Sequence, residues 1–182
     1  MRIKLLKEEF VIPEKVTVDV NGYSVTVKGP KGELKRDFPD KQVSIEKKDN
    51  KVVVFAKDAS KREKTMVGTF TAHIKNMTLG VQNPHVYKLK ICSGHFPMSV
   101  AVAGKDFVVK NFLGESIPRK LRLRDGVNVK VEGEFVIVDG INKELASQTA
   151  ASIEQLVRIT NRDRRIFQDG IWIIEKDSKK VE

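Results

Sequence analysis

Apolar and polar residues alternate in several short stretches of the chain, and the same series of stretches occurs twice. Val16, Val18 and Val20 mark one such stretch, and Val100 and Val102 mark its counterpart. This alternation predicts half-buried β-strands, because successive side chains of a strand point to opposite faces of a sheet. Further strands are predicted at residues 24–28, 43–45, 52–56 and 86–92 in the first series and at 106–110, 127–131, 135–138 and 170–175 in the second.

Each series also contains one segment with the 3.6-residue period of an amphipathic helix. The first helix is predicted over Lys61–Thr78, where Ser60 and Glu63 have the spacing of a capping box and Gly80 ends the helix. The second is predicted over Lys143–Thr160, with Asn142 as its N-cap. The predicted buried stripes are Met66, Phe70, Ile74 and Met77 in the first helix and Leu145, Thr149, Ile153 and Leu156 in the second.

The two series are related by a constant offset of 82 residues. Val16–Gly22 falls on Met98–Gly104, and Ser60 at the first helix falls on Asn142 at the second, with no gap in between. Because the same elements recur in the same order, the sequence predicts a tandem duplication of one small α+β domain. Residues 16–78 and 98–160 are then expected to superpose.

The predicted fold class is therefore α+β, with small antiparallel or mixed sheets and one helix around a single core in each copy. Gly80, Asn83 and Pro84 interrupt any regular element between the copies. This interruption predicts a first domain over residues 1–81 and a second over residues 82–182.

Charge adds a functional preference to this picture. The 182 residues include 34 Lys and Arg and 24 Asp and Glu, which gives a formal net charge of +10. Such a charge favours anionic partners, with nucleic acid first and a membrane surface second. The single cysteine, Cys92, excludes an intramolecular disulfide and suits a reducing cytoplasm. No signal peptide and no membrane-spanning stretch is apparent, so we expect a soluble cytoplasmic protein.

Two clusters of basic residues in the second half are the candidate RNA-binding sites. An arginine offers a planar fork that grips phosphate with two hydrogen bonds and stacks on bases. Alternatively, basic residues after a helix complement its dipole, and those on a strand form a solvated face with Leu121 and Leu123 inside. The cluster after the second helix consists of Arg158, Arg162, Arg164 and Arg165, and the cluster on the strand-like stretch consists of Arg119, Lys120, Arg122 and Arg124.

Two further basic features are less specific. Lys61, Arg62 and Lys64 open the first helix, where its dipole disfavours cations, so either an anionic partner or simple solvation explains them. The glycine-rich segment Lys28–Leu34 lacks the spacing of a phosphate-binding loop and does not open a helix. We interpret it as a hairpin turn.

Catalysis is not indicated by the residues. Cys92 and His95 could supply a nucleophile and a base, or two metal ligands, but no further ligand or base accompanies them. We interpret them as a half-buried cysteine on a strand and a histidine in a turn. His85 is expected in the linker between the domains. The sequence therefore predicts no cofactor, no metal and no enzymatic activity.

The segment Asn161–Ile171 closely resembles the C-terminal signature of the universal large-subunit ribosomal protein six family, in its archaeal and eukaryotic branch. His95–Pro97, Val109–Gly114 and Gly29–Gly32 are also similar to motifs of that family, and the resemblance covers essentially the whole chain. An archaeal member is expected. The family has two copies of one fold, in agreement with the repeat.

The resemblance implies a structural, rRNA-binding role in the large ribosomal subunit, beside neighbouring large-subunit proteins. It also implies that the second domain is the main rRNA-binding domain and docks near the sarcin–ricin stem, close to where translational GTPases bind. Arg162, Arg164 and Arg165 match the family signature and would face the RNA.

Two other classes of function remain open at this point. One is an RNA-modifying enzyme or nuclease without a recognisable active-site motif. The other is a membrane-surface adaptor, although neither predicted helix has a wholly basic face beside a wholly apolar one. Co-sedimentation with large ribosomal subunits would separate the scaffold protein from both.

Overall fold

The computed structural model describes residues 3–94, 96–177 and 179–181, and the chain divides into two units, Met1–Pro84 and His85–Glu182. The division lies after Pro84, whereas the sequence placed the domain boundary after residue 81. Each unit has its own hydrophobic core.

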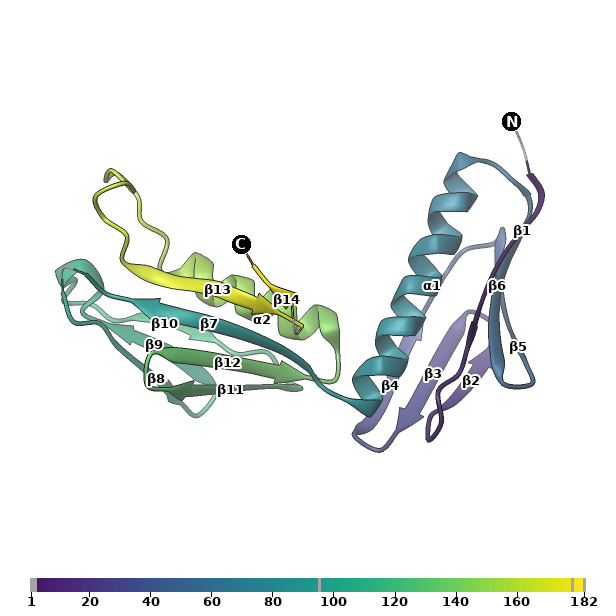
Figure 1. Cartoon of the computed structure of the whole chain (residues 1–182), viewed down its shortest axis with the longest axis horizontal. Helices are drawn as coiled ribbons and strands as arrows, with labels where there is room; N and C mark the ends of the chain where they lie inside the picture. Colours follow the sequence, from purple (N-terminus) through teal and green to yellow (C-terminus); the bar gives the residue numbers. More distant parts are fainter. Residues whose placement is uncertain (1–2, 95, 178, 182) are drawn as a thin grey trace. The chain divides into compact units, whose positions relative to one another are not determined.

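The first unit contains one long helix, α1 (Lys61–Gln82), packed against two antiparallel sheets (Figure 1). Its strands are β1 (Ile3–Val11), β2 (Thr17–Asn21), β3 (Ser24–Gly29), β4 (Gly32–Asp37), β5 (Val43–Lys48) and β6 (Lys51–Ala59). The sheets have the strand orders β1-β6-β5 and β2-β3-β4. The valines of the predicted alternation, such as Val18, Val25 and Val54, are fully buried between the sheets and the helix.

The start of α1 is confirmed, because Ser60 and Glu63 form the predicted capping box. The Glu63 carboxylate accepts hydrogen bonds from the Ser60 backbone N–H, at 2.8 Å, and from the Ser60 hydroxyl, while the N–H of Arg62 donates to Ser60 Oγ at 3.3 Å. These bonds satisfy N–H groups that the first turn of a helix leaves unpaired. The hydrogen bonds from the Ser60 hydroxyl and backbone lower the pKa of Glu63.

The predicted end of α1 is wrong, because the helix continues past Gly80 to Gln82. Val81 is fully buried, and its carbonyl oxygen accepts a hydrogen bond from the N–H of Lys31 at 3.0 Å. Tertiary packing therefore holds the last turn in helical form. The helix ends only where Pro84 forces Asn83 into an extended conformation.

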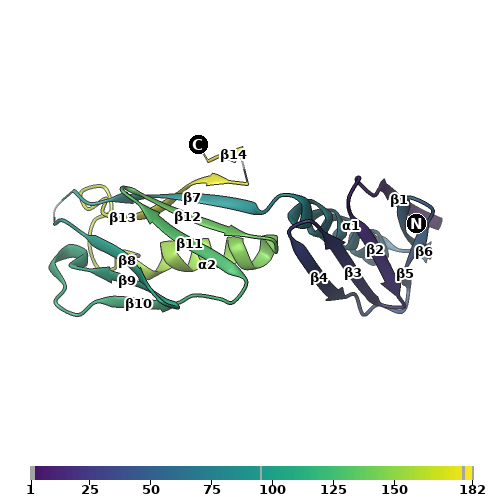
Figure 2. The ribbon, with the colours of Figure 1, turned by 90° about the horizontal axis from the view of Figure 1, so that it is seen from below.

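The second unit repeats this plan and then adds a hairpin (Figure 2). Its helix is α2 (Lys143–Leu156), and a short 3₁₀ helix covers Phe112–Gly114. Its strands are β7 (His85–Cys92), β8 (Ser99–Ala103), β9 (Asp106–Lys110), β10 (Arg119–Arg122), β11 (Val127–Glu132), β12 (Phe135–Gly140), β13 (Gly170–Lys176) and β14 (Lys179–Lys180). The sheets, both antiparallel, have the orders β10-β9-β8 and β11-β12-β7-β13-β14.

The predicted start of α2 is confirmed and its predicted end is wrong. Asn142 caps the helix by accepting hydrogen bonds from the N–H groups of Glu144 and Leu145. The helix ends at Leu156, four residues before Thr160. Val157 and Ile159 are both buried in the core. Residues at positions i and i+2 lie on the same side of an extended segment but on different sides of a helix, so the chain must leave the helix to bury both.

The buried faces of the two helices are shifted from the predicted stripes. Phe70, Ile74 and Met77 are buried as expected, whereas Met66 is only half-buried and Val67 beside it is fully buried. In α2 the residues that contact the core include Ala146 and Ala150 along with the predicted Thr149 and Ile153, while Leu145 and Leu156 are half-buried. Because alanine side chains are small, they allow the backbone of α2 to approach its sheet closely. The predicted stripe consisted of larger residues, so the sequence did not indicate that these alanines face the core.

The strand after α1 does not complete the first repeat, as the sequence suggested, but begins the second. It is β7, which pairs with β12 on one side and with β13 on the other. Its counterpart in the first unit is β1, an element that the alternation did not predict. β13 and β14 have no counterpart in the described part of the first unit.

The uninterrupted offset of 82 residues holds only in part. Gly22 and Gly104, which turn the hairpins β2–β3 and β8–β9, keep that offset and both have positive φ, +60° and +62°. The hairpin β5–β6 turns at Asp49-Asn50 and the hairpin β11–β12 at Gly133-Glu134, an offset of 84. Within residues 16–78 and 98–160 the strands and the helix thus recur in the same order, as predicted, but the predicted register in the second hairpin is wrong.

Candidate nucleic-acid interface

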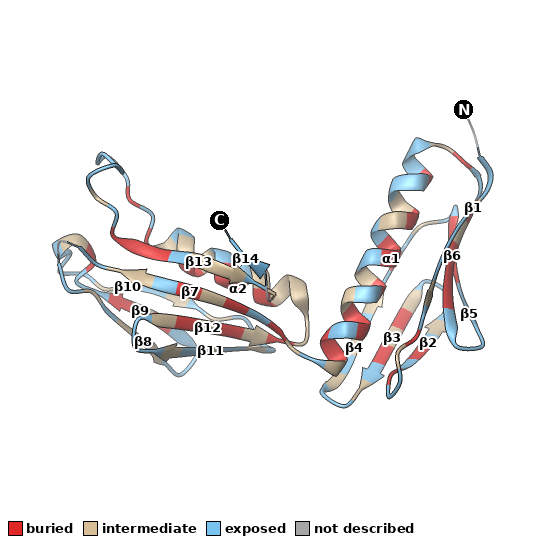
Figure 3. Cartoon of the chain, in the orientation of Figure 1, coloured by how far each residue is buried: buried red, intermediate tan, exposed pale blue. Residues whose placement is uncertain are grey.

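The first basic cluster lies on the connection between α2 and β13, residues 158–169, which we call the arginine loop. Residues 160–166 of this loop are all exposed, and the loop extends past the end of the sheet (Figures 1 and 3). Its two ends are held in place: Ile159 is buried in the core, and the buried Asp169 accepts a hydrogen bond from the N–H of Gly94. A fixed base therefore presents an exposed tip.

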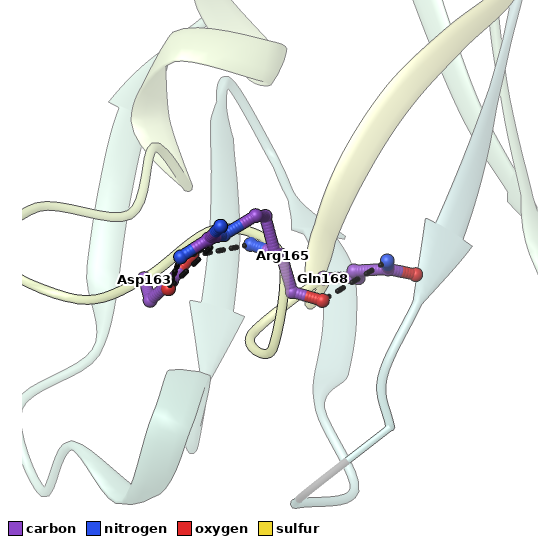
Figure 4. A network of polar contacts seen from close by, with 3 residues as sticks. All are labelled: Asp163, Arg165 and Gln168. Carbon is purple, nitrogen blue, oxygen red and sulfur yellow. Dashed lines mark hydrogen bonds and ion pairs between the residues drawn. The ribbon is translucent and has the colours of Figure 1, made fainter.

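The tip of the arginine loop is a turn built around Asp163 (Figure 4). The Asp163 carboxylate accepts a hydrogen bond from the N–H of Arg165 at 2.9 Å, and the Asp163 carbonyl accepts from the N–H groups of Ile166 and Phe167 at 3.1 and 2.9 Å. Aspartate commonly stabilises turns in this way, through its side chain and the backbone two residues on. The Gln168 amide also donates to the Arg165 carbonyl, at 3.4 Å.

Arg165 forms a two-pronged ion pair with Asp163 at the surface. Its Nε lies 3.1 and 3.2 Å from the two carboxylate oxygens, and its Nη2 lies 2.8 Å from one of them. The hydrogen bonds of this pair lower the pKa of Asp163 and raise the pKa of Arg165. The Arg165 side chain is 90% exposed, so the pair is open to competition from an external phosphate.

Two other arginines of the loop lie over aromatic rings. The guanidinium carbon of Arg162 lies 4.9 Å from the centre of the Phe167 ring, and that of Arg164 lies 5.9 Å from the centre of a Trp172 ring. Stacking orients a guanidinium without using its N–H groups. Among the described residues no acidic side chain pairs with Arg158, Arg162 or Arg164, so their donors face solvent.

A groove of about 380 Å³ lies between the end of α2 and the start of β13. Arg158 and Arg164 line it together with Trp172, whose indole N–H donates to the Gln168 carbonyl at 3.3 Å. On the opposite side of the loop, Ile166 and Gln168 line a second groove of about 600 Å³ that also includes Lys90. Cationic and aromatic groups thus border the first groove, whereas no aromatic residue lines the second and the acidic Glu134 and Asp169 accompany Lys90 there.

The second basic cluster separates into exposed and internally bonded residues. Arg119 donates to both oxygens of Glu115 and to the carbonyl oxygens of Leu156, at 2.8 Å, and Arg158, at 3.5 Å. Its guanidinium carbon also lies 4.4 Å from the centre of the Phe112 ring. Arg119 therefore connects β10 to the end of α2, and this use of the residue was not apparent from the sequence.

The remaining members of that cluster are exposed. Lys120 and Arg122 point outward from β10, while Leu121 and Leu123 are half-buried, as the alternation predicted. Arg124 donates to the side-chain oxygen of Gln148 at 2.6 Å. The Arg119 bond to the Arg158 carbonyl places the start of the arginine loop beside β10.

The basic residues that the sequence singled out in the first unit form no comparable site within the described residues 3–84. Lys61, Arg62 and Lys64 are exposed on the first turn of α1. The Gly29–Gly32 segment is the hairpin turn between β3 and β4, as interpreted from the sequence. Its Lys31 N–H is bonded to Val81 and is not available to a phosphate.

Possible catalytic groups are not assembled into a site among the residues described. Cys92 is half-buried on β7 and pairs with Gly170, whereas its expected partner His95 lies outside the described residues. His85 does not lie in a linker, as expected, but is buried at the start of β7 with Nδ1 2.9 Å from Asp177. The described residues contain no group of His, Cys, Asp and Glu side chains that could hold a metal ion.

Asp177 connects three elements at the end of the second unit. Besides the bond with His85, its other carboxylate oxygen lies 3.0 Å from Lys143 Nζ at the start of α2, and its N–H donates to the Val86 carbonyl. Burial raises the pKa of Asp177, but the hydrogen bonds from His85 and Lys143 outweigh it and lower the pKa overall. The cluster holds the hairpin β13–β14 in place.

None of the described helices is both long and apolar enough to cross a membrane.

A duplicated α+β fold with an arginine-rich loop on its second copy is the arrangement expected of a basic protein that binds nucleic acid. The family model described as ribosomal protein L6 matches the chain twice, over residues 12–83 and 96–170. The large ribosomal subunit protein uL6 of Methanococcus vannielii is 47% identical over 175 residues, which cover 96% of each chain. That of Aeropyrum pernix is 47% identical over 171 residues, 93% of this chain and 94% of its own.

This chain belongs to the ribosomal protein L6 family. Both relatives are archaeal, so the resemblance drawn from the Asn161–Ile171 segment and the expectation of an archaeal member are confirmed. The two matched segments also confirm the tandem duplication. Members of this family are structural proteins, so the hypotheses of an RNA-modifying enzyme and of a membrane adaptor are set aside.

Proposed function

We propose that this chain is a structural, rRNA-binding protein of the large ribosomal subunit in the cytoplasm, and that its second unit is the main rRNA-binding domain. The arginine loop makes the principal contact, and the docking site is the region of the sarcin–ricin stem, close to the binding site of translational GTPases. Family membership supports the role in the subunit. The docking position rests on the resemblance of the Asn161–Ile171 segment.

The observation that carries this proposal is the arrangement of guanidinium groups on the loop. Arg158, Arg162 and Arg164 are exposed, have no acidic partner among the described residues, and are oriented by a turn with fixed ends. A purely solvated helix end would need neither the stacked aromatic rings nor the turn at Asp163. Arg165 joins them when a phosphate displaces the Asp163 carboxylate.

The expected contact reads the RNA backbone and shape. An A-form stem hides its base edges in a deep, narrow groove, so side chains reach mainly phosphates and 2′-hydroxyls. Lys120 and Arg122, exposed on the neighbouring β10, add phosphate contacts beside the loop. Arg119 and Arg124, which are bonded within the unit, support this surface from behind.

A triple substitution tests the proposal. Replacing Arg162, Arg164 and Arg165 by alanine is expected to weaken binding to large-subunit rRNA and to flatten its salt dependence, because each phosphate contact that is lost releases fewer counterions. The melting temperature should hardly change, because exposed substitutions alter stability by only about 0.5 kcal/mol. An affinity and a salt slope equal to those of the wild type would refute the RNA role of the loop.

A matched control separates local contacts from net charge. Lys41, Lys47 and Lys57 are exposed in the first unit, and their replacement by alanine removes the same three charges. This control should reduce the affinity much less. If it reduces the affinity as much as the loop variant does, binding follows net charge and the loop is not the site.

Directed cleavage tests the docking position. Asn161 is exposed on the loop, and in a Cys92→Ser background Asn161→Cys can carry an iron chelate that cleaves nearby RNA. Cuts in the sarcin–ricin stem of assembled subunits are expected. Cuts confined to other regions would contradict the position while leaving the RNA-binding role intact.

A further inference from the structure

The two copies of the fold differ at one sheet edge. In the second unit, β7 pairs with β12 on one side and with β13 on the other. In the first unit, the equivalent strand β1 pairs with β6 on one side, and no strand of the described residues pairs with its other side. The second unit therefore shows what the free side of β1 can accommodate.

A pair of hydrogen bonds establishes which residues are equivalent. The N–H of Ile12, just after β1, donates to the Asn50 carbonyl at 2.9 Å, and the N–H of Ile91 on β7 donates to the Glu134 carbonyl at 2.8 Å. Asn50 and Glu134 occupy the same position in their hairpin turns. Ile12 thus corresponds to Ile91.

This equivalence identifies the outward-facing backbone of β1. The backbone groups of successive strand residues point alternately to the two sides, so Lys7, Glu9 and Val11 direct their N–H and C=O groups away from β6. Their equivalents on β7 are Val86, Lys88 and Lys90, which lie along the β13 side. The carbonyl of Val86 indeed accepts the N–H of Asp177, next to β13, at 2.9 Å.

The side chains beside this edge are also suited to an added strand. Leu6 and Phe10 are only partly buried against the core on the α1 side, where β13 in the second unit contributes the buried Ile171. On the other face Leu5 is 58% exposed and Val11 60% exposed. Between them Lys7 and Glu9 form an ion pair at 3.0 Å, and charged residues of this kind protect a free edge against non-specific pairing.

We propose that the free edge of β1 binds an extended, antiparallel segment of a neighbouring large-subunit protein, with an apolar residue at every second position. Addition of a strand to an exposed edge is an established mode of peptide recognition, in which main-chain hydrogen bonds give affinity and alternate side chains give selectivity. β13 supplies the template, with Ile171 and Ile173 facing the helix of its own unit. This surface belongs to the first unit, whereas the arginine loop belongs to the second.

Photo-crosslinking in assembled subunits tests the proposal. A benzophenone amino acid at Leu5 should crosslink to one extended segment of another large-subunit protein, whereas the same group at Tyr23, 54% exposed in the β2–β3 turn, should not. Crosslinks from Leu5 to rRNA alone, to a second copy of this chain, or to nothing would overturn the proposal.

A pair of substitutions at Glu9 tests the mode of binding. Proline at this position removes only an outward N–H and is tolerated on edge strands, whereas threonine keeps the N–H. Both changes remove the ion pairs of Glu9 with Lys7 and Lys51, so they are matched. Glu9→Pro should abolish the Leu5 crosslink and Glu9→Thr should keep it; an unchanged crosslink in the proline variant would overturn strand addition.

Hydrogen exchange of the wild-type protein keeps the test independent of how the proline variant folds. Exchange of the Lys7, Glu9 and Val11 amides should slow by about tenfold or more between the free protein and the large subunit. Equal rates in the two states would show that no strand adds to this edge.

Discussion

Arg119 donates a hydrogen bond to the carbonyl oxygen of Leu156 at 2.8 Å and thereby joins β10 to the last turn of α2. The carbonyl groups of the last turn of a helix have no partner within the helix. Arg119 satisfies the carbonyl of Leu156 and, more weakly, that of Arg158, while Glu115 balances its charge. One residue of a basic cluster thus terminates a helix.

Replacing Arg119 by alanine is expected to destabilise the second unit. The part-buried Leu156 carbonyl would then lose its partner, which costs about 1–3 kcal/mol, whereas water solvates the exposed Glu115 carboxylate. Lys120→Ala, its exposed neighbour, should change the free energy of unfolding by no more than about 0.5 kcal/mol. Urea denaturation of both variants measures the difference, and equal stabilities would show that Arg119 is merely a surface cation.

Replacing Asp163 by asparagine is expected to strengthen RNA binding. Asparagine keeps the side-chain oxygen that accepts the Arg165 N–H, but it removes the negative charge that occupies the guanidinium. Because water and salt screen an exposed ion pair, the affinity gain should be small, at most about fivefold. Asp163→Ala removes the turn bond as well and should bind less tightly than Asp163→Asn in the same filter-binding assay; the reverse order would contradict the role of the turn.

The stability of the second unit should depend on acid pH through Asp177. The pKa of Asp177 in the folded protein is lower than its ordinary value of 3.8. The carboxylate therefore makes its full contribution to the free energy of unfolding above pH 3.8, and this contribution is lost as the pH falls through the folded pKa. Below about pH 4, the melting temperature of the wild type should therefore fall more steeply with decreasing pH than that of Asp177→Asn. At pH 7 the variant should melt at a lower temperature, and parallel curves would exclude this contribution.

Two glycines of the first unit are expected to respond oppositely to alanine. A Cβ at Gly29 would lie 2.7 Å from Cγ2 and 2.9 Å from the backbone oxygen of Val81, so Gly29→Ala should cost about 1–3 kcal/mol by separating β3 from α1. A Cβ at Gly68, inside α1, would meet nothing nearer than Glu8 at 4.0 Å, so Gly68→Ala should stabilise by about 0.5–1 kcal/mol. Differential scanning calorimetry of the pair checks both signs.

Element starts could be predicted from local residues, and element ends could not. The capping groups Ser60 and Asn142 lie next to the helices that they begin, so the sequence alone locates both starts. The ends depend on distant partners: Val81 packs beside Gly29, and the Leu156 carbonyl binds Arg119. β1 was missed because its partly buried Leu6 and Phe10 are four residues apart and separated by charges.

The candidate site could be located from the sequence but not resolved into roles. Four arginines close together after a helix indicated an exposed basic turn, and the structure places them on one. Whether an arginine is stacked, paired or bonded to a backbone carbonyl depends on residues far along the chain, such as Trp172 for Arg164 and Leu156 for Arg119. The buried contact of His85 with Asp177 left no signal in the sequence, because 92 residues separate the two.

Trp172 is the single tryptophan of the chain, and it lies at the base of the arginine loop with its ring beside Arg164. When the protein is excited at the red edge of the tryptophan absorption band, its fluorescence therefore originates from one indole. This indole is 37% exposed, and its N–H donates to the Gln168 carbonyl. A nucleotide that enters the adjoining groove changes the polarity around this indole. The native protein thus contains an optical reporter for the proposed RNA contact, which needs no attached dye.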